Sequence, residues 1–280
     1  TSCASPVGEW HFNEKTGITA NDTGTSAQNG TLTSGPTWTS GKNGAGISFD
    51  GSDDYVEIGS SVRASGATSG TITAWIKHED ATANQNIFGY GGAATADGGS
   101  FELMYNGNGF DVLDIIQSSD GQATVNIVRG DDTLSANTWY HVALTSSGTS
   151  WTLYVNGRQQ SLTVQGGSNN GNWLGDTTVT ETDATSIGRN LQNGSYENPF
   201  NGIIDRVRLY DYALTAAQIA WDYNRGGPVG WWKMDECQGT TTYDSSITNA
   251  NNGTITPGAS GQTGAGDGNV VIDAVDSNTI

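Results

Sequence analysis

Short apolar runs separated by clusters of glycine, asparagine, aspartate and serine restrict how this chain can fold more than any other feature. Glycine alone accounts for 40 of the 280 residues, and it recurs between the runs. Many short strands broken by turn residues are typical of a β-sandwich or barrel. We therefore predict an all-β fold with strands near residues 8–13, 46–49, 55–58, 71–77, 86–90, 101–105, 112–117, 123–129, 139–145, 151–155, 185–187 and 202–210.

Two of these runs alternate clearly enough to be assigned as half-buried strands. In residues 71–77 (TITAWIK) and Trp151–Val155 (WTLYV), every second residue is apolar, so one face of each strand is expected to be buried. Asn156-Gly157 follows the second run, and both residues tolerate positive φ, as a type I′ hairpin turn requires. The strands on either side of this turn should therefore pair antiparallel.

One helix is expected, over residues 215–224. Thr215 can cap its first turn, alanines at 216, 217 and 220 favour helix, and Gly226-Gly227-Pro228 ends it. This short helix would close the first domain.

The opening segment of the chain recurs after that helix. Residues 7–14 (VGEWHFNE) correspond to residues 229–236 (VGWWKMDE), and Asn29-Gly30-Thr31-Leu32 corresponds to Asn252-Gly253-Thr254-Ile255. Phe49-Asp50 then aligns with Ile272-Asp273. Self-similarity at a fixed offset indicates a repeated structural unit.

The repeat divides the chain into three parts. We predict an N-terminal extension over residues 1–6, a β-sandwich over 7–226 and an incomplete second repeat over 227–280, with only its opening strands. About fifty residues of this kind bury too little surface to fold alone. They could come from a longer tandem array, pack against the first domain, or complete a neighbouring molecule by adding strands to its sheet.

The charge balance limits the choice of partners. Acidic residues outnumber basic residues 29 to 11, and the net charge of −18 would repel nucleic acid and an anionic membrane surface. No apolar run approaches the ~20 residues of a membrane helix, so membrane insertion is not expected. Carboxylates on a surface rich in oxygen donors suit extracellular calcium, although charge for solubility alone is the alternative.

The cysteines and the first residue bear on localisation. Cys3 and Cys237 could form one disulfide between the start of the chain and the second repeat, or remain two free thiols. The sequence starts at Thr1 with neither an initiator methionine nor an apolar leader, which we interpret as a processed chain or one without its targeting segment. We expect an extracellular or cell-surface location.

Seven segments in order resemble the laminin-G-like, concanavalin A-like jelly-roll family, in particular its bacterial cell-surface branch. They are residues 10–14 with Asp22, residues 29–32 (NGTL), 46–58 (GISFDGSDDYVEI), 71–77 (TITAWIK), 138–145 (TWYHVALT), 153–157 (LYVNG) and 200–219 (FNGIIDRVRLYDYALTAAQI). The resemblance implies a sandwich of two antiparallel sheets whose termini meet at one edge, commonly near a structural calcium ion.

The same resemblance supplies candidate calcium ligands: Glu14, Asp22, Asp50 and Asp205. Asp205 interrupts an apolar strand (IIDRV) and Asp50 precedes Gly51 in a turn. Each has a purely structural alternative, since Asp205 could pair with Arg206 or Arg208, and Asp22 and Asp50 could bond their own backbone in Asx turns.

The sequence carries no pattern typical of catalysis. Jelly-roll glycoside hydrolases need two carboxylates flanking the scissile bond, which in a strand would appear as acids at alternate positions, and no Glu-x-Asp-x-Glu occurs. The three histidines lack a metal-binding spacing. We therefore predict a protein that is not an enzyme.

Two functions remain. The first is a structural or adhesive subunit that self-associates through the second repeat into an array or filament. The second is a recognition module that binds a glycan or a surface protein through its loops. In that case Trp173 could stack on a sugar ring, although a buried Trp173 is the alternative.

Overall fold

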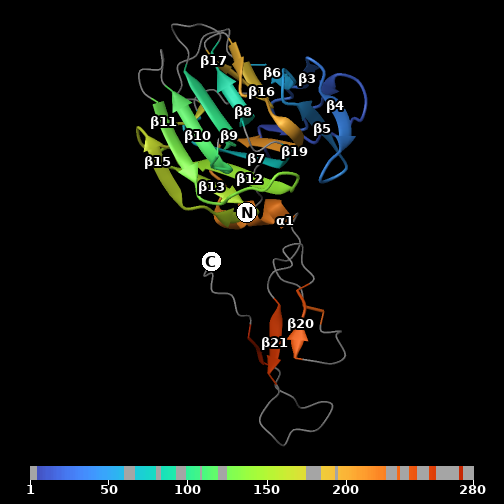
Figure 1. Ribbon diagram of the computed structural model, residues 1–280, viewed down its shortest axis with the longest axis vertical. Coiled ribbons are helices and arrows are strands. Elements are labelled where there is room, and N and C mark those ends of the chain that lie inside the picture. The colour runs from blue at the N-terminus through green and yellow to red at the C-terminus, as the bar shows by residue number, and fades with distance from the viewer. Residues whose placement is uncertain are drawn as a thin grey trace, which may run out of the picture. The chain divides into compact units, whose positions relative to one another are not determined.

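The protein is described by a computed structural model, shown as a ribbon in Figure 1. The residues it describes are 5–59, 67–79, 83–92, 99–107, 109–118, 125–174, 184–192, 195–224, 232–233, 240–244, 252–256 and 271–273. The chain divides into two compact units, residues 1–219 and 220–280. This division falls inside the C-terminal helix, before the boundary predicted at residue 226.

Two antiparallel sheets form the first unit, as the strand pattern predicted. In the described residues, the eight-stranded sheet runs in the order β14 (Arg158–Gln159), β13 (Trp151–Val155), β12 (Tyr140–Ser146), β7 (Gly70–His78), β19 (Asn201–Tyr210), β5 (Ala45–Asp50) and β4 (Thr37–Ser40), with β1 (Gly8–Trp10) also on β19.

The nine-stranded sheet forms the other layer. Its order is β15 (Leu162–Gly166), β11 (Val125–Gly130), β10 (Val112–Ser118), β9 (Ser100–Asn106), β8 (Asn84–Gly91), β16 (Ala184–Ile187), β6 (Tyr55–Ile58), β3 (Gly30–Thr33) and β2 (Thr19–Ala20). A small hairpin of β17 (Asn190–Gln192) and β18 (Ser195–Glu197) contacts β8 and β9. In Figure 1, β8 to β11 run side by side in this layer.

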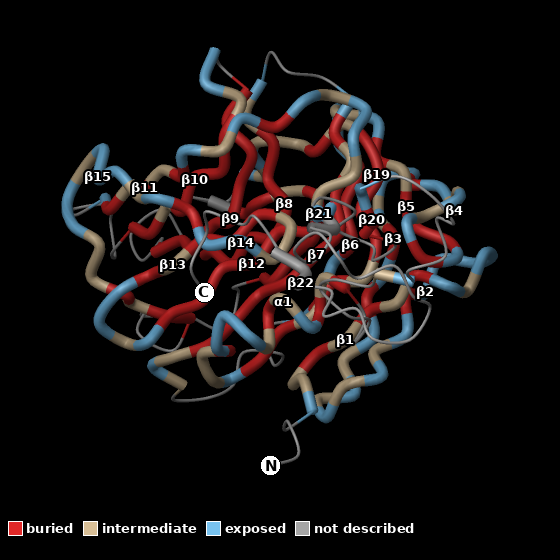
Figure 2. Tube along the Cα trace, turned by 90° about the horizontal axis from the view of Figure 1, so that it is seen from below, coloured by how far each residue is buried: buried red, intermediate tan, exposed pale blue. Residues whose placement is uncertain are grey.

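The core lies between the inner faces of the two sheets. Ile72, Ala74 and Ile76 of β7 point inward, as do Phe101 and its alternate neighbours in β9, because successive side chains of a strand point to opposite faces. Figure 2 shows buried residues running through both layers, with exposed residues concentrated in turns and in edge strands such as β4 and β15.

The predicted hairpin and helix are both confirmed. Asn156 and Gly157 have φ of 50° and 76°, and Val155 pairs with Arg158 across them. The helix α1 (Ala216–Asn224) begins after Thr215, whose backbone N–H donates to Gln218 Oε1 at 2.8 Å while its Oγ1 accepts from Gln218 N at 3.3 Å. This reciprocal pair is a capping box. Within the described residues no helix is long and apolar enough to cross a membrane.

The second unit repeats the opening hairpin of the first. Thr19 pairs with Thr31 and Ala20 with Gly30 in β2–β3, and Thr241 pairs with Thr254 and Thr242 with Gly253 in β20 (Thr241–Thr242) and β21 (Gly253–Thr256). The bridge between Trp10 and Asp22 recurs between Trp232 and Asp244. The recurring sequence therefore forms the same local structure twice.

The third strand of the second unit departs from the sequence alignment. Ile272-Asp273 aligns with Phe49-Asp50 of β5, yet β22 (Val271–Asp273) pairs with β21. In the first unit β3 pairs with β6 instead, and β5 belongs to the other sheet. The sequence alignment therefore did not predict the pairing partner of β22, because strand pairing depends on which strand edges are available rather than on sequence order.

The first strand is held on β19 by an ion pair. Arg208 Nε donates to Glu9 Oε1 at 2.7 Å, and His11 Nε2 lies 3.4 Å from the same oxygen. The hydrogen bond from His11, followed by the contribution of Arg208, lowers the pKa of Glu9 to about 2 against the opposing effect of burial. Glu9 is therefore ionised at neutral pH.

We expect Glu9→Gln to lower the free energy of unfolding at pH 7 by about 1–2 kcal/mol, since a hydrogen-bonded charge pair of limited exposure is lost. A carboxylate with a lowered pKa stabilises the fold above its unfolded pKa and loses this contribution as pH falls toward about 2. Urea titrations from pH 7 to pH 2 should therefore show the two proteins converging. A difference that is independent of pH would contradict this assignment.

Candidate functional site

The four predicted calcium ligands do not converge on one point. Asp50 pairs with Asn201 at one end of the β19–β5 ladder, and Asp205 lies four residues farther along β19, ~13 Å away at the rise of an extended strand. Asp22 and Glu14 belong to the loops around β2. Asp50 and Asp205 therefore cannot bind the same ion, and each of the four residues stays a separate candidate ligand.

Asp22 has a structural role. Its Oδ1 accepts from the backbone N–H groups of Glu9 and Gly24 at 2.8 and 2.7 Å, and its Oδ2 accepts from Ser26 Oγ and Gln28 N at 2.6 and 2.8 Å. These four donors occupy the lone pairs a metal would need. Glu14 is partly used in the same way, because its Oε1 accepts both N–H groups of Asn21 at 2.7 and 2.9 Å.

Asp50 lies in a group of three aspartates, of which only Asp50 was among the predicted calcium ligands. Carboxylate oxygens of Asp50, Asp53 and Asp54 lie within 4.8 Å of one another. The backbone N–H of Asp50 donates to Asp54 Oδ2 at 3.0 Å, and Ser52 N donates to Asp50 Oδ1 at 2.8 Å. Burial raises the pKa of Asp54, partly offset by the hydrogen bond from Asp50. The Asx turn considered as the structural alternative for Asp50 is thus present.

Asp205 and Glu14 are the predicted ligands that each have one buried carboxylate oxygen without a hydrogen-bond partner in the described residues. Asp205 is fully buried, its Oδ2 accepts from Asn43 N at 2.8 Å, and its Oδ1 has no hydrogen-bond partner in the described part of the chain. Burial raises the pKa of Asp205 to about 6, against the lowering effect of backbone N–H groups that include Asn43. Of the two arginines considered as partners, Arg208 donates to Glu9 instead, whereas the charge of Arg206 lowers the pKa of Asp205.

Trp173 is not available to stack on a sugar. The side chain is 1% exposed, and its ring lies 5.3 Å from that of Phe101 at an interplanar angle of 69°. Gly70 packs against the indole so closely that a Cβ there would come within 2.1 Å of it. Of the two alternatives considered for Trp173, the buried side chain is the one found in the structure.

Cys3 and Cys237 lie outside the described residues, so their pairing stays a prediction.

An exposed aromatic residue occurs instead at the β9–β10 turn, on the outer face of the nine-stranded sheet. Phe110 is 53% exposed, and the Arg129 guanidinium lies 3.8 Å from its ring centroid. Arg129 donates from Nε and Nη2 to the two oxygens of Asp114, both at 2.9 Å. Asn106 Nδ2 also donates to Asp114 Oδ2, at 2.7 Å. We call these four residues the Phe110 cluster.

The Phe110 cluster is held in a fixed geometry. Tyr105 donates its hydroxyl to Asp111 Oδ1 at 2.8 Å, and Leu134 N donates to Asp111 O at 2.7 Å, so the residue that follows Phe110 is bonded both to β9 and to the loop after β11. The hydrogen bond to Asp114 raises the pKa of Arg129 and keeps its guanidinium charged. A half-exposed ring therefore stands beside polar groups whose positions are fixed before any ligand binds.

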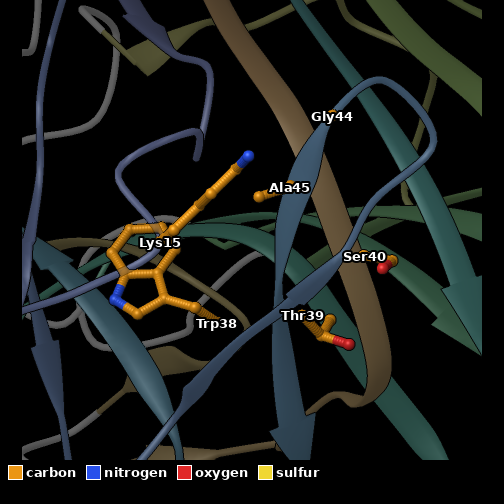
Figure 3. A pocket seen from close by; sticks show the side chains of 6 residues that line it. All are labelled: Lys15, Trp38, Thr39, Ser40, Gly44 and Ala45. Carbon is orange, nitrogen blue, oxygen red and sulfur yellow. The ribbon is translucent and has the colours of Figure 1, made fainter.

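A separate hollow of about 450 Å³ lies at the β4 edge and is lined by Lys15, Trp38, Thr39, Ser40, Gly44 and Ala45. Figure 3 shows Trp38 and Thr39 pointing to opposite sides of β4, as alternation along a strand requires. The Trp38 indole N–H already donates to Gly17 O at 2.8 Å. The polar groups that line this hollow therefore do not converge on one point, unlike those of the Phe110 cluster.

Two face-to-face antiparallel sheets with one helix define a concanavalin A-like jelly-roll sandwich. A laminin G family model, described as the concanavalin A-like lectin/glucanases superfamily, matches residues 50–220. The chain belongs to this superfamily, as its sequence motifs indicated.

Solved structures with the same fold share little sequence with this chain. Domain 4 of AbnA, an extracellular arabinanase of family GH43 from Geobacillus stearothermophilus, solved with arabinotriose, is 18% identical with a TM-score of 0.58; the match covers 79% of this chain and 99% of that one. The CBM40 of the Ruminococcus gnavus IT-sialidase, bound to α2,3 sialyllactose, is 16% identical with a TM-score of 0.53, covering 64% and 96%. The binding domain of Paraclostridial Mosquitocidal Protein 1 is 13% identical with a TM-score of 0.56, covering 96% and 75%. No curated protein sequence matched.

The sequence offered only a weak signal for the Phe110 cluster. Phe110 follows Asn-Gly-Asn-Gly, which is a turn composition, and a large apolar side chain in a turn is a candidate for exposure. Arg129 and Asp114 are distant in sequence and meet only because β10 pairs with β11.

The assignment of Asp22 to structure can be tested by Asp22→Asn. An amide can accept on only one side, so at least two of the four donors lose their acceptor, and we expect the free energy of unfolding to fall by about 2–3 kcal/mol. The same loss should appear in calcium and in chelator. A loss confined to calcium-containing buffer would instead identify Asp22 as a calcium ligand.

Proposed function

We propose that this chain is a non-catalytic carbohydrate-recognition module of an extracellular or cell-surface protein, and that the Phe110 cluster contacts the sugar. The observation that carries the proposal is the half-exposed Phe110 ring beside Arg129, which Asp114 holds by two hydrogen bonds of 2.9 Å. The fold comparisons support it, because domain 4 of AbnA and the CBM40 domain were both solved with oligosaccharides.

The chemistry of the Phe110 cluster suits a sugar. The C–H face of a pyranose or furanose ring is apolar and can pack against an aromatic ring, while its hydroxyls need donors and acceptors around the rim. Phe110 supplies the apolar surface, and the Arg129 guanidinium supplies N–H groups beside the ring. Because these groups are already fixed, little conformational entropy is lost on binding.

Charge favours a neutral sugar over an acidic one. Arg129 is already paired with Asp114, so the Phe110 cluster carries no surplus positive charge, and the whole chain carries a net charge of −18. An anionic ligand would be repelled at long range. We therefore expect a neutral oligosaccharide such as arabinotriose to bind better than sialyllactose.

The arrangement of acids supports a non-catalytic role. Glu102 and Asp114 share the outer face of the nine-stranded sheet, since Asp114 pairs with Met104 and Ile116 with Glu102. Glycoside hydrolysis needs two carboxylates on either side of a substrate, ~5–10 Å apart. Both acids are buried, at 2% and 1% exposed, and Asp114 is occupied by Arg129 and Asn106. Neither could reach a glycosidic bond in this arrangement.

Calcium remains part of the proposal, with Asp205 as the ligand. The fully buried Asp205 Oδ1 has no hydrogen-bond partner in the described residues. A buried carboxylate oxygen without a partner destabilises the fold unless the group is protonated or bound to a cation, and calcium binds carboxylate and carbonyl oxygens. Bound there, the ion would neutralise Asp205 and stabilise the adjoining β4–β5 turn.

Assembly through the second repeat is the alternative function. It is supported by the hairpin of β20 and β21, which reproduces the pairing of β2 and β3 and could add strands to another sheet. Size-exclusion chromatography in calcium distinguishes the two functions. A recognition module should elute as a monomer at all concentrations, whereas an assembling subunit should form larger species as concentration rises.

We expect Phe110→Ala to weaken binding of arabinotriose by about tenfold in isothermal titration calorimetry, because the stacking surface is lost. Phe110 is exposed, so the melting temperature should not change. Trp221→Ala, which removes an aromatic side chain 63% exposed on α1, serves as the matched control and should bind like the parent. Equal affinity of all three proteins would place the sugar elsewhere.

Removal of calcium should lower the melting temperature of the parent by about 5–10 °C when the free ion had been about a hundredfold above its Kd. Asp205→Asn should melt at one temperature with and without chelator, because the amide cannot neutralise the ion. An unchanged midpoint of the parent in chelator would exclude a structural ion at Asp205.

A further inference from the structure

The β17–β18 hairpin closes over a buried carboxylate on the outer face of the nine-stranded sheet. Glu102 of β9 is 2% exposed, and Asn190 of β17 is fully buried. Asn86 of β8 joins the two, because its Nδ2 donates to Glu102 Oε2 at 3.0 Å and its backbone N–H donates to Asn198 O, just after the hairpin, at 2.7 Å. Segments from separate parts of the fold therefore enclose one carboxylate.

Two glycines of β8 allow the hairpin to approach this closely. A Cβ on Gly91 would lie 1.9 Å from Leu191 O, and one on Gly89 would lie 2.7 Å from Asn190 Oδ1. Gly89 pairs directly with Glu102 in the β8–β9 ladder. The hairpin therefore lies directly on the sheet beside Glu102, and its movement away would open this side of the carboxylate to water.

Two opposing effects act on the Glu102 carboxylate. Burial is the larger effect and raises the pKa of Glu102 to about 7, although hydrogen bonds from the side-chain amides of Asn86, Asn198 and Asn190 lower it. The amides stabilise the anion, but they do not fully replace the water that the closed hairpin excludes.

The charged groups around Glu102 do not compensate its charge. No lysine, arginine or histidine of the described ranges forms an ion pair with Glu102, and β8 contains no charged residue. Glu197 on β18 raises the pKa of Glu102 further. Asp114, on the same face of β10, is paired with Arg129, and the Arg189 guanidinium, next to the hairpin, donates to two backbone oxygens. Within the described residues, an ionised Glu102 is thus a buried anion stabilised by neutral donors.

We propose that the β17–β18 hairpin is a pH-dependent flap over the nine-stranded sheet, closed while Glu102 is protonated and loosened once Glu102 ionises. Opening the hairpin returns the carboxylate to water, where its charged form is well hydrated. A protonated Glu102 gains much less from that exposure, so acidic pH favours the closed hairpin.

Proton linkage fixes the direction and size of the effect. The pKa of Glu102 is about 7 under the closed hairpin, against an ordinary value of 4.5 in water. Below pH 4.5 the carboxyl group is protonated in both states, and between the two pKa values opening releases a proton, so opening becomes more favourable as pH rises. The two values differ by 7 − 4.5, or about 2.5 pH units, which is a factor of about 300 in the opening equilibrium. Above pH 7 no further change is expected.

The flap is independent of the other proposals. Neither the Phe110 cluster nor Asp205 uses Glu102 or a residue of the hairpin. Carbohydrate binding or calcium binding can therefore fail without affecting this proposal, and the reverse is also true.

Amide hydrogen exchange measures opening of the hairpin on the full chain. After correction for the intrinsic pH dependence of exchange, residues 190–192 and 195–197 of the parent should exchange up to about 300-fold faster at pH 8 than at pH 4. Glu102→Gln should lose this dependence, because its amide is neutral at every pH. Glu57→Gln, which neutralises an exposed glutamate on β6 of the same sheet, should behave like the parent.

A second measurement follows Glu102 itself and needs no variant that removes it. The NMR signal of its carboxyl carbon in the parent should titrate with a midpoint near pH 7 rather than near 4.5. Glu197→Gln removes an exposed charge that raises the pKa of Glu102, so it should move this midpoint and the exchange transition together to lower pH. A midpoint near 4.5, or the same pH dependence of hairpin exchange in the parent and in Glu102→Gln, would overturn the proposal.

Discussion

The sandwich depends on strand β19 changing partners along one of its edges. Asn201 to Ile204 pair with β5, and Val207 to Leu209 pair with β1, while the opposite edge of β19 pairs with β7 throughout. The bulge between Asp205 and Arg208 lies where the partner changes, and Arg206 there has a φ of 51°. A bulge of this kind bends the strand and increases its twist, so both partners can reach the same edge.

The change of partner also explains the burial of Asp205. Between the residues of β19 that pair with β5 and those that pair with β1, the backbone of the β4–β5 turn approaches β19. Asn43 N donates to the Asp205 carboxylate there. Gly41 is required at this point, because a Cβ would lie 2.4 Å from Ala45 O and 2.7 Å from Asp205 Oδ2. Asp205, the acid that interrupts the apolar strand, thus lies where β19, β5 and β1 meet.

The outer face of the nine-stranded sheet follows a different physical principle. Its polar side chains are buried by the β17–β18 hairpin around Glu102 and by one another around Asp114, and among the described residues of this face Phe110 presents an aromatic ring to solvent. Buried polar groups fix geometry when every partner is present. The fully bonded Asp114 therefore suits a rigid recognition surface.

The sequence by itself determined the all-β class, the family, the Asn156-Gly157 hairpin, the capped helix and the recurrence of the opening hairpin. All of these depend on neighbouring residues: alternation, turn chemistry, capping and repetition are local properties. Tertiary structure alone decided which acids meet, because strand pairing places Arg129 beside Asp114 and separates Asp50 from Asp205 along one ladder. It also decided that Trp173 is buried, since only the packed sandwich brings Gly70 and Phe101 against its ring.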